Sequence, residues 1–109
     1  MAAHEFGIMP VPPDQDRRFD EYDPAPYGCV SVDDEIIGPL LDRLADLDCF
    51  WHTLARPGKG LACTGITLIP PSTAGRFLGL LEGTGGTEAL REVLRKAQAQ
   101  GRFVIHFGL

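Results

Sequence analysis

The spacing of apolar and polar residues predicts two short strands in the first third of the chain. Residues 4–11, HEFGIMPV, form an apolar run of strand length. The prolines that follow end this run, because proline cannot donate a hydrogen bond to a neighbouring strand. A second run ends at Ser31 or Val32, and the acidic residues 33–35 then supply the negative charge that favours the start of a helix.

Apolar residues recur every three or four positions in three later segments, which is the period of an amphipathic helix. The first segment carries one apolar stripe, formed by Ile36, Ile37, Leu40, Leu41, Leu44 and Leu47. We expect its regular part to start at Gly38 or Pro39, because a proline deep in a helix loses a hydrogen bond. A second helix is predicted to run to about Glu82 after a Ser-Thr cap, and a third over residues 87–100.

The middle of the chain predicts a β-hairpin. Residues 49–55 and 61–69 are rich in aromatic, β-branched and threonine residues, and the turn sequence RPGKG separates them. Its tip would carry Arg56 and Lys59. These two residues are candidates for binding an acidic group of a partner, although exposed basic tips more commonly serve solubility.

The last residues, RFVIHFGL, predict a central strand because both of its faces carry apolar side chains. Val104 and His106 share the face with fewer large apolar groups, so we expect His106 to line an open side of the sheet. The element order predicts one α+β domain over residues 1–109. Its core would be a mixed, mostly antiparallel sheet of about five strands with about three helices packed on it.

Residues 12–27, PPDQDRRFDEYDPAPY, form an acidic, proline-rich connection without helical or alternating periodicity. Connections of this length are uncommon in compact domains and are often functional or mobile. Aromatic residues set among carboxylates can anchor on a basic partner while the charges speed encounter. The candidate contacts are Phe19, Glu21, Tyr22 and Asp23. Alternatively, the connection is solvated and its aromatic rings cover a sheet edge.

Charge and composition exclude several classes of protein. The formal net charge is −5 and the basic residues are scattered, which argues against nucleic-acid binding. No apolar run reaches the length of a membrane span, and the first residues lack the features of a signal peptide. The cysteines, Cys29, Cys49 and Cys63, are odd in number and widely spaced, as in reduced thiols of a cytoplasmic protein.

Candidate catalytic chemistry centres on His52, Cys63 and His106. A histidine beside Cys63 could lower the pKa of the thiol and create a nucleophile. Whether His52 lies on the same face as Cys63 depends on the register of the hairpin, which the sequence leaves open. His4, His52 and His106 all fall on predicted strands, but no paired ligand spacing supports a metal site. We expect neither a metal nor another cofactor.

Three segments, EFGIM, FWHTLARPGKGLACTGITLIPP and GRFVIHFGL, resemble a group of short bacterial proteins without an assigned function. The resemblance implies a bacterial, cytoplasmic protein and carries over no catalytic residue. Small acidic α+β proteins of this size often neutralise partners, as immunity proteins do for toxins, which is an analogy of size and charge.

Two functional hypotheses follow from the sequence. The first is a small acidic, non-enzymatic module of immunity or regulatory type, which binds another protein, a basic one in particular, through the acidic connection and the hairpin tip. The second is a small enzyme or ligand-binding domain with a Cys/His pocket on the sheet. Neither involves a nucleic acid or a membrane, and both leave the oligomeric state open.

Overall fold

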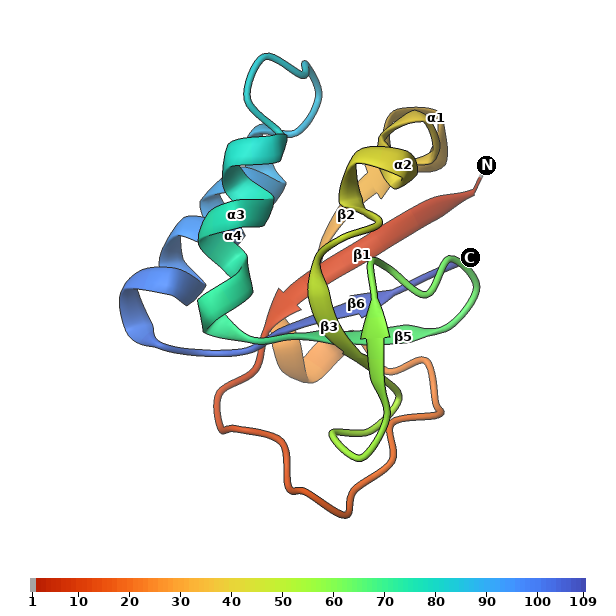
Figure 1. Cartoon of the computed structure of the whole chain (residues 1–109), viewed down its shortest axis with the longest axis vertical. Helices are drawn as coiled ribbons and strands as arrows, with labels where there is room; N and C mark the ends of the chain where they lie inside the picture. The colour runs from red at the N-terminus through yellow and green to blue at the C-terminus, as the bar shows by residue number, and fades with distance from the viewer. Residues whose placement is uncertain (1) are drawn as a thin grey trace.

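The computed structural model describes residues 2–109, in which six strands form one antiparallel sheet of order β2-β1-β6-β5-β3-β4 (Figure 1). The strands are β1 (Ala3–Ile8), β2 (Val30–Asp33), β3 (Asp48–Trp51), β4 (Pro57–Lys59), β5 (Ile66–Ile69) and β6 (Val104–Phe107). The predicted α+β fold is confirmed, and β6 lies inside the sheet between β1 and β5.

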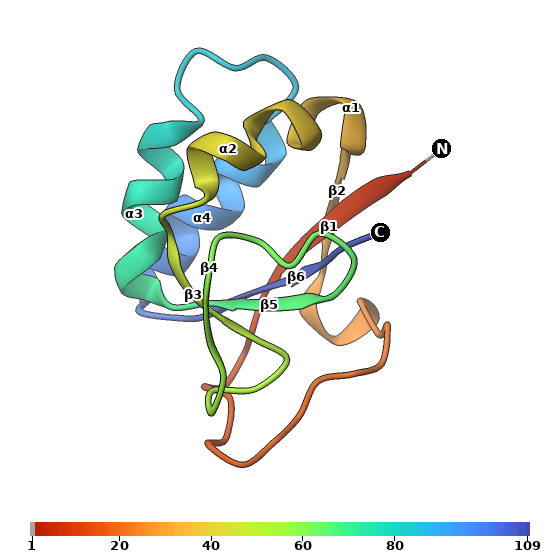
Figure 2. The same ribbon diagram turned by 45° about the vertical axis from the view of Figure 1, so that its right-hand side comes forward.

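The helices lie together against one face of the sheet (Figure 2). They are α1 (Asp34–Ile37), α2 (Leu41–Leu44), α3 (Pro71–Leu80) and α4 (Glu88–Gln100), with a 3₁₀ turn at Gly38–Leu40 between α1 and α2. A second 3₁₀ turn, Ala25–Tyr27, precedes β2, and its Tyr27 packs on the opposite face. The expected start of the first helix is wrong. An α-helical turn begins at Asp34, where the Asp33 side chain accepts a hydrogen bond from the Glu35 N–H, and the 3₁₀ turn follows around Pro39.

The predicted hairpin is correct in its pairing and wrong in its turn. β3 and β5 are antiparallel neighbours, with Phe50 opposite Leu68. The sequence expected to form the turn instead contains β4, which pairs with the other edge of β3. Gly58 lies against the Trp51 ring, where an added Cβ would meet ring carbons at 2.6 Å. A glycine therefore lets this segment pack as a strand.

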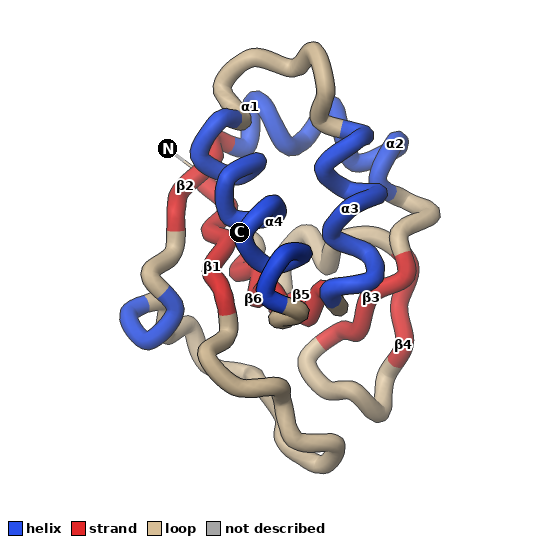
Figure 3. Tube along the Cα trace, turned by 90° about the vertical axis from the view of Figure 1, so that its left-hand side faces the viewer, coloured by secondary structure: helices blue, strands red, loops and turns tan. Residues whose placement is uncertain are grey.

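Side chains alternate between the two faces along each strand, so each face has its own core. On the helix face the core contains Phe6, Val32, Ile69, Val104 and the apolar stripes of the helices. On the opposite face a smaller core contains Met9, Phe19, Ile66, Leu68, Ile105 and Phe107. We call this second surface the coil face, because the acidic connection of residues 12–27 packs Phe19 and Tyr27 against it. Figure 3 looks at the molecule from the helix side, and the loop that follows β1 lies below the helices in this view.

Both ends of the described chain lie at the same end of the sheet (Figure 1). Near them, backbone hydrogen bonds join the residues that follow β6 to the loop that precedes β5. The Gly108 N–H donates to the Gly65 carbonyl at 2.8 Å, and the Leu109 N–H donates to the Cys63 carbonyl at 2.8 Å. Among residues 2–109, no helix is long and apolar enough to cross a membrane.

Candidate functional site

A pocket of about 570 Å³ opens on the coil face, and residues near both ends of the described chain contribute to its lining. We call it the coil-face pocket. Strand ends and the connection both contribute to its lining, which comprises Ala2, Ala3, Glu5, Asp20, Tyr22, His52, Thr64, Gly65, Ile66, Phe107, Gly108 and Leu109. No lysine or arginine is among these described lining residues.

Strand alternation explains how the floor of the coil-face pocket is built. Glu5, Ile66 and Phe107 lie on neighbouring strands and point to the coil face, with Phe107 directly opposite both Glu5 and Ile66. The acidic connection then brings Asp20 and Tyr22 over this floor. The pocket thus combines two carboxylates with apolar and aromatic surface, a composition typical of recognition sites.

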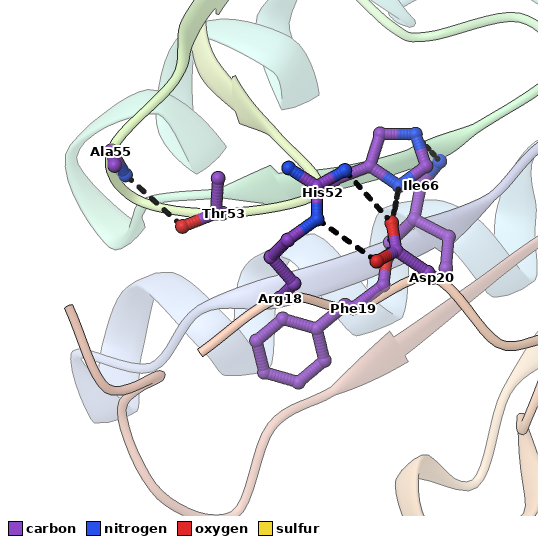
Figure 4. Close-up of polar contacts among 7 residues, drawn as sticks. All are labelled: Arg18, Phe19, Asp20, His52, Thr53, Ala55 and Ile66. Atoms are coloured by element: carbon purple, nitrogen blue, oxygen red, sulfur yellow. Dashed lines mark hydrogen bonds and ion pairs between the residues drawn. The ribbon is translucent and has the colours of Figure 1, made fainter. Parts of the chain in front are cut away.

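His52 fastens the connection to the sheet (Figure 4). Its Nδ1 donates to the Phe19 carbonyl at 2.9 Å and lies 3.0 Å from the Asp20 carboxylate. The Phe19 N–H returns a bond to the His52 carbonyl at 2.7 Å. On the other side of the ring, the Ile66 N–H approaches Nε2 at 3.5 Å. Because the carbonyl requires a donor, neutral His52 carries its proton on Nδ1.

Two backbone features position the His52 ring: the positive φ of His52 and the close approach of Gly65. His52 has a φ of 65°, in the left-handed region that non-glycine residues seldom occupy, and β3 ends just before it. Gly65 packs against the ring, and an added Cβ there would meet Nε2 at 2.6 Å. A glycine at this position is therefore needed for the ring to sit between the connection and β5.

Hydrogen bonds made by the connection shift the pKa values of two of its side chains, Asp20 and Tyr22. The Arg18 guanidinium makes two hydrogen bonds to Asp20, at 2.9 and 3.1 Å, and these bonds hold the pKa of Asp20 below its ordinary value. The Tyr22 hydroxyl donates to Glu5, and this bond raises the pKa of Tyr22. Since a carboxylate has about four acceptor sites, Glu5 can accept further hydrogen bonds besides that from Tyr22.

The predicted catalytic trio is not assembled. His52 and Cys63 both lie outside the strands, and the hydrogen bonds of the His52 ring described in residues 2–109 go to Phe19, Asp20 and Ile66. The expectation that His106 lines an open side of the sheet is wrong, because His106 points to the helix face and is fully buried. The helices cover that face, which the strand's own composition does not reveal.

The predicted partner-binding residues divide between two regions. Tyr22 lines the coil-face pocket, while Glu21 and Asp23 lie in an adjoining hollow of about 340 Å³ that shares Asp20 and Phe107 with it. The expectation that Phe19 is an exposed anchor for a partner is wrong. Phe19 is only 6% exposed, and its ring belongs to the coil-face core.

The basic candidates lie apart from the coil-face pocket. Arg56 stacks over the Trp51 ring at 5.8 Å from its centroid, and Lys59 pairs with Asp48 on the β3–β4 edge. The Lys59 ammonium lowers the pKa of Asp48 through this hydrogen bond. The structure therefore does not bring Arg56 and Lys59 together with the acidic candidates into one surface.

A second polar cluster, which the sequence did not reveal, lies on the helix face. The His4 Nε2 is 2.8 Å from the Asp34 carboxylate, and the His4 Nδ1 is 2.8 Å from the His106 Nε2. The His106 Nδ1 is 3.1 Å from the Thr67 hydroxyl, which also accepts from the Ala62 N–H at 2.8 Å. We call the side chains of Asp34, His4, His106 and Thr67 the helix-face chain.

Burial dominates the chemistry of the helix-face chain. Both imidazoles are 0% exposed, and their rings stack with centroids 5.1 Å apart. Burial first, and then the neighbouring His4, lowers the pKa of His106 to about 3. Within residues 2–109, no group of three or more His, Cys, Asp and Glu side chains is arranged to hold a metal ion.

Sequence reasoning missed the helix-face chain for an identifiable reason. His4 and His106 are 102 residues apart in the chain, and Asp34 is 30 residues from His4. Their contact depends on the pairing of β1 with β6, which no local spacing encodes. The signal that the sequence does offer is one histidine on each of two apolar strands, each an unusual residue for a buried face.

Comparisons with protein-family models, with curated proteins and with solved structures found no match to this chain.

Proposed function

We propose that the protein is a small, non-enzymatic protein-binding module that takes a basic segment of its partner into the coil-face pocket. One observation carries this proposal. Of the three large hydrophobic side chains that are exposed within residues 2–109, Tyr22 and Leu109 line this pocket, at 66% and 46% exposed, and Val11 does not. Exposed apolar side chains gathered around a pocket are typical of binding sites.

Charge supports a basic partner. The pocket lining contains the carboxylates of Glu5 and of Asp20, which is paired with Arg18, and no lysine or arginine among its described residues. The exposed residues Glu21 and Asp23 lie in the adjoining hollow, which Arg17 and Arg18 also line, and the whole chain carries a formal net charge of −5. A lysine or arginine side chain of a partner would meet acceptors at the floor and the Tyr22 ring at the rim, where a cation–π contact is favourable.

The enzymatic alternative has less support from the geometry. A general base needs a free ring nitrogen that faces the pocket, but both nitrogens of His52 face partners in the fold. Burial raises the pKa of Cys29 to about 11 and that of Cys49 to about 12. Rapid alkylation of Cys63 by iodoacetamide near neutral pH would favour the alternative, whereas our proposal expects three slowly reacting thiols.

A nuclear magnetic resonance titration tests the proposal. Hexalysine, added to the ¹⁵N-labelled protein at low salt, should shift the backbone amides of Glu5, Tyr22, Gly65 and Phe107. Hexaglutamate should not shift them. The affinity for hexalysine should fall as salt is raised, because exposed charges are screened.

Two matched variants sharpen this titration. Tyr22→Ala removes a ring from the pocket rim and should weaken hexalysine binding by about tenfold, the loss typical of an interface aromatic residue. Val11→Ala removes a side chain with the same 66% exposure outside the pocket and should leave binding unchanged. Equal losses in the two variants, or equal shifts with both peptides, would contradict the proposal.

A further inference from the structure

The helix-face chain lies directly behind the floor of the coil-face pocket. His106 precedes the lining residue Phe107, and Thr67 follows the lining residue Ile66, so each pair points to opposite faces of one strand. On β1, His4 precedes the lining residue Glu5, so these two side chains also point to opposite faces. The polar chain and the pocket floor are therefore two sides of the same three strands.

Both ends of the helix-face chain also hold segments that line the pocket. At one end, the backbone N–H of Asp34 donates to the Ala2 carbonyl at 3.0 Å. At the other end, the Thr67 hydroxyl accepts from Ala62, at the start of the loop that brings Thr64 and Gly65 to the pocket. A change in the hydrogen bonds of Thr67 therefore affects the loop that lines the pocket.

With Asp34 ionised and both imidazoles neutral, the hydrogen bonds of the chain can run in only one direction. Asp34 requires a donor, so His4 carries its proton on Nε2 and accepts at Nδ1. His106 must then donate from Nε2 and accept at Nδ1 from the Thr67 hydroxyl. Each donor has one acceptor, and the Ala62 N–H completes the chain at Thr67.

The surroundings allow the chain to take up one proton and oppose a second. Among the described residues, the charged or titratable groups bonded to the two rings are Asp34 from α1 and the rings themselves, while β5 contributes the uncharged Thr67. β2 places Val32 opposite His4, and the Phe6 ring packs 4.8 Å from that of His106. A proton is best accommodated at His4, which faces the carboxylate, and two adjacent buried cations would repel.

We propose that the helix-face chain is a one-proton switch, in which protonation of His4 reverses its hydrogen bonds and moves His106 from the Nε2–H to the Nδ1–H tautomer. Protonated His4 donates from both nitrogens, so the His106 Nε2 must become an acceptor. The His106 Nδ1–H then donates to Thr67, whose hydroxyl hydrogen turns away. The balance is one proton from solvent: His4 gains one, and His106 and Thr67 keep one each.

The consequence for the coil-face pocket rests on the proposed function. After reversal, Thr67 accepts from His106 as well as from Ala62, and its own hydroxyl hydrogen needs a new acceptor in a fully buried position. We expect the loop over residues 62–65, which is bonded to Thr67 through Ala62, to move and supply it. We expect this adjustment to weaken the binding of a basic segment by about tenfold, within the range usual for coupled sites.

Ring ¹⁵N spectra of the histidines, recorded from pH 8 to pH 5, test the switch directly. In the wild-type protein and in Thr67→Ser, which keeps the hydroxyl, His106 should change from Nε2–H to Nδ1–H in the same pH interval in which His4 becomes doubly protonated. Thr67→Val removes the acceptor, so His106 should remain Nε2–H. If wild-type His106 remains Nε2–H throughout, the proposal is overturned.

Hexalysine affinity and the amide signals of Thr64 and Gly65, followed over the same pH range, separate this proposal from the proposed function. Both proposals are supported if the affinity for hexalysine falls with the tautomer change in the wild type and in Thr67→Ser, and stays constant in Thr67→Val. If the tautomer changes and the two amide signals shift, but no peptide binds at any pH, the switch is supported and the proposed function is rejected. Peptide binding with a fixed His106 tautomer rejects the switch alone.

Discussion

The two faces of the sheet use histidine in opposite ways. On the helix face, His4 and His106 are fully buried and take all of their partners from side chains. On the coil face, His52 is partly exposed, and its ring bonds chiefly to backbone groups of the connection and β5. The first arrangement sets the direction of a buried hydrogen-bond chain, and the second attaches a long surface segment.

This difference determines how each site responds to change. A buried polar group that loses its partner costs the full desolvation penalty, whereas a partly exposed group regains hydrogen bonds to water. We therefore expect substitutions on the helix face to affect stability more strongly. Substitutions on the coil face should act mainly on the position of the connection and on the pocket that it covers.

The largest effect is expected from His106→Leu. The leucine leaves the His4 Nδ1 without a donor and the Thr67 hydroxyl without an acceptor, at a cost of about 1–3 kcal/mol for each buried group. The free energy of unfolding, measured by urea denaturation, should fall by about 2–6 kcal/mol. His106→Gln, whose amide can still donate toward His4, should lose clearly less. Equal stability of the two variants would contradict the importance of the chain.

A smaller effect is expected from acid. Burial lowers the pKa of His106 from 6.5 to about 3, so between these values the unfolded chain binds a proton that the folded chain excludes. The contribution of neutral His106 is complete above pH 6.5 and is lost as the pH falls toward 3, by about 1.4 kcal/mol per pH unit. From pH 7 to pH 5, the wild type should lose about 2 kcal/mol more than His106→Gln. Parallel pH profiles from urea denaturation would contradict a depressed pKa.

The smallest effect is expected from Gly65→Ala on the coil face. The new Cβ would displace the His52 ring, which then loses its bond to Phe19, at a cost of about 1 kcal/mol. Gly79→Ala is the matched control, because no atom lies within 4 Å of the added Cβ in helix α3. Urea denaturation should show a loss for Gly65→Ala and none for Gly79→Ala. A larger loss in Gly79→Ala would contradict the role of the close approach.

Local patterns predicted the elements whose apolar period is regular. The alternation of Val104 and His106 with Ile105 and Phe107 places these side chains on the faces that the structure shows. The regular apolar stripe of helix α4, from Leu90 to Ala97, likewise predicted its position within a residue at its start. In both cases the information lies within a few neighbouring residues.

The arrangements that failed prediction depend on contacts between distant segments. The strand β4 forms because Gly58 fits against the Trp51 ring, and its sequence alone has the composition of a turn. The covering of the His106 face comes from helices, while the coil face is covered by Phe19 and the rest of the connection. The register that unites His4 with His106 follows from the whole sheet order.

The ring tautomers of the three histidines test the contrast between the two faces most directly. In two-bond ¹H–¹⁵N spectra at pH 8, we predict Nε2–H for His4 and His106 and Nδ1–H for His52. Asparagine and glutamine variants of each histidine assign the signals. An Nδ1–H tautomer for either helix-face ring, or an Nε2–H tautomer for His52, would contradict the hydrogen-bond directions from which both sites were derived.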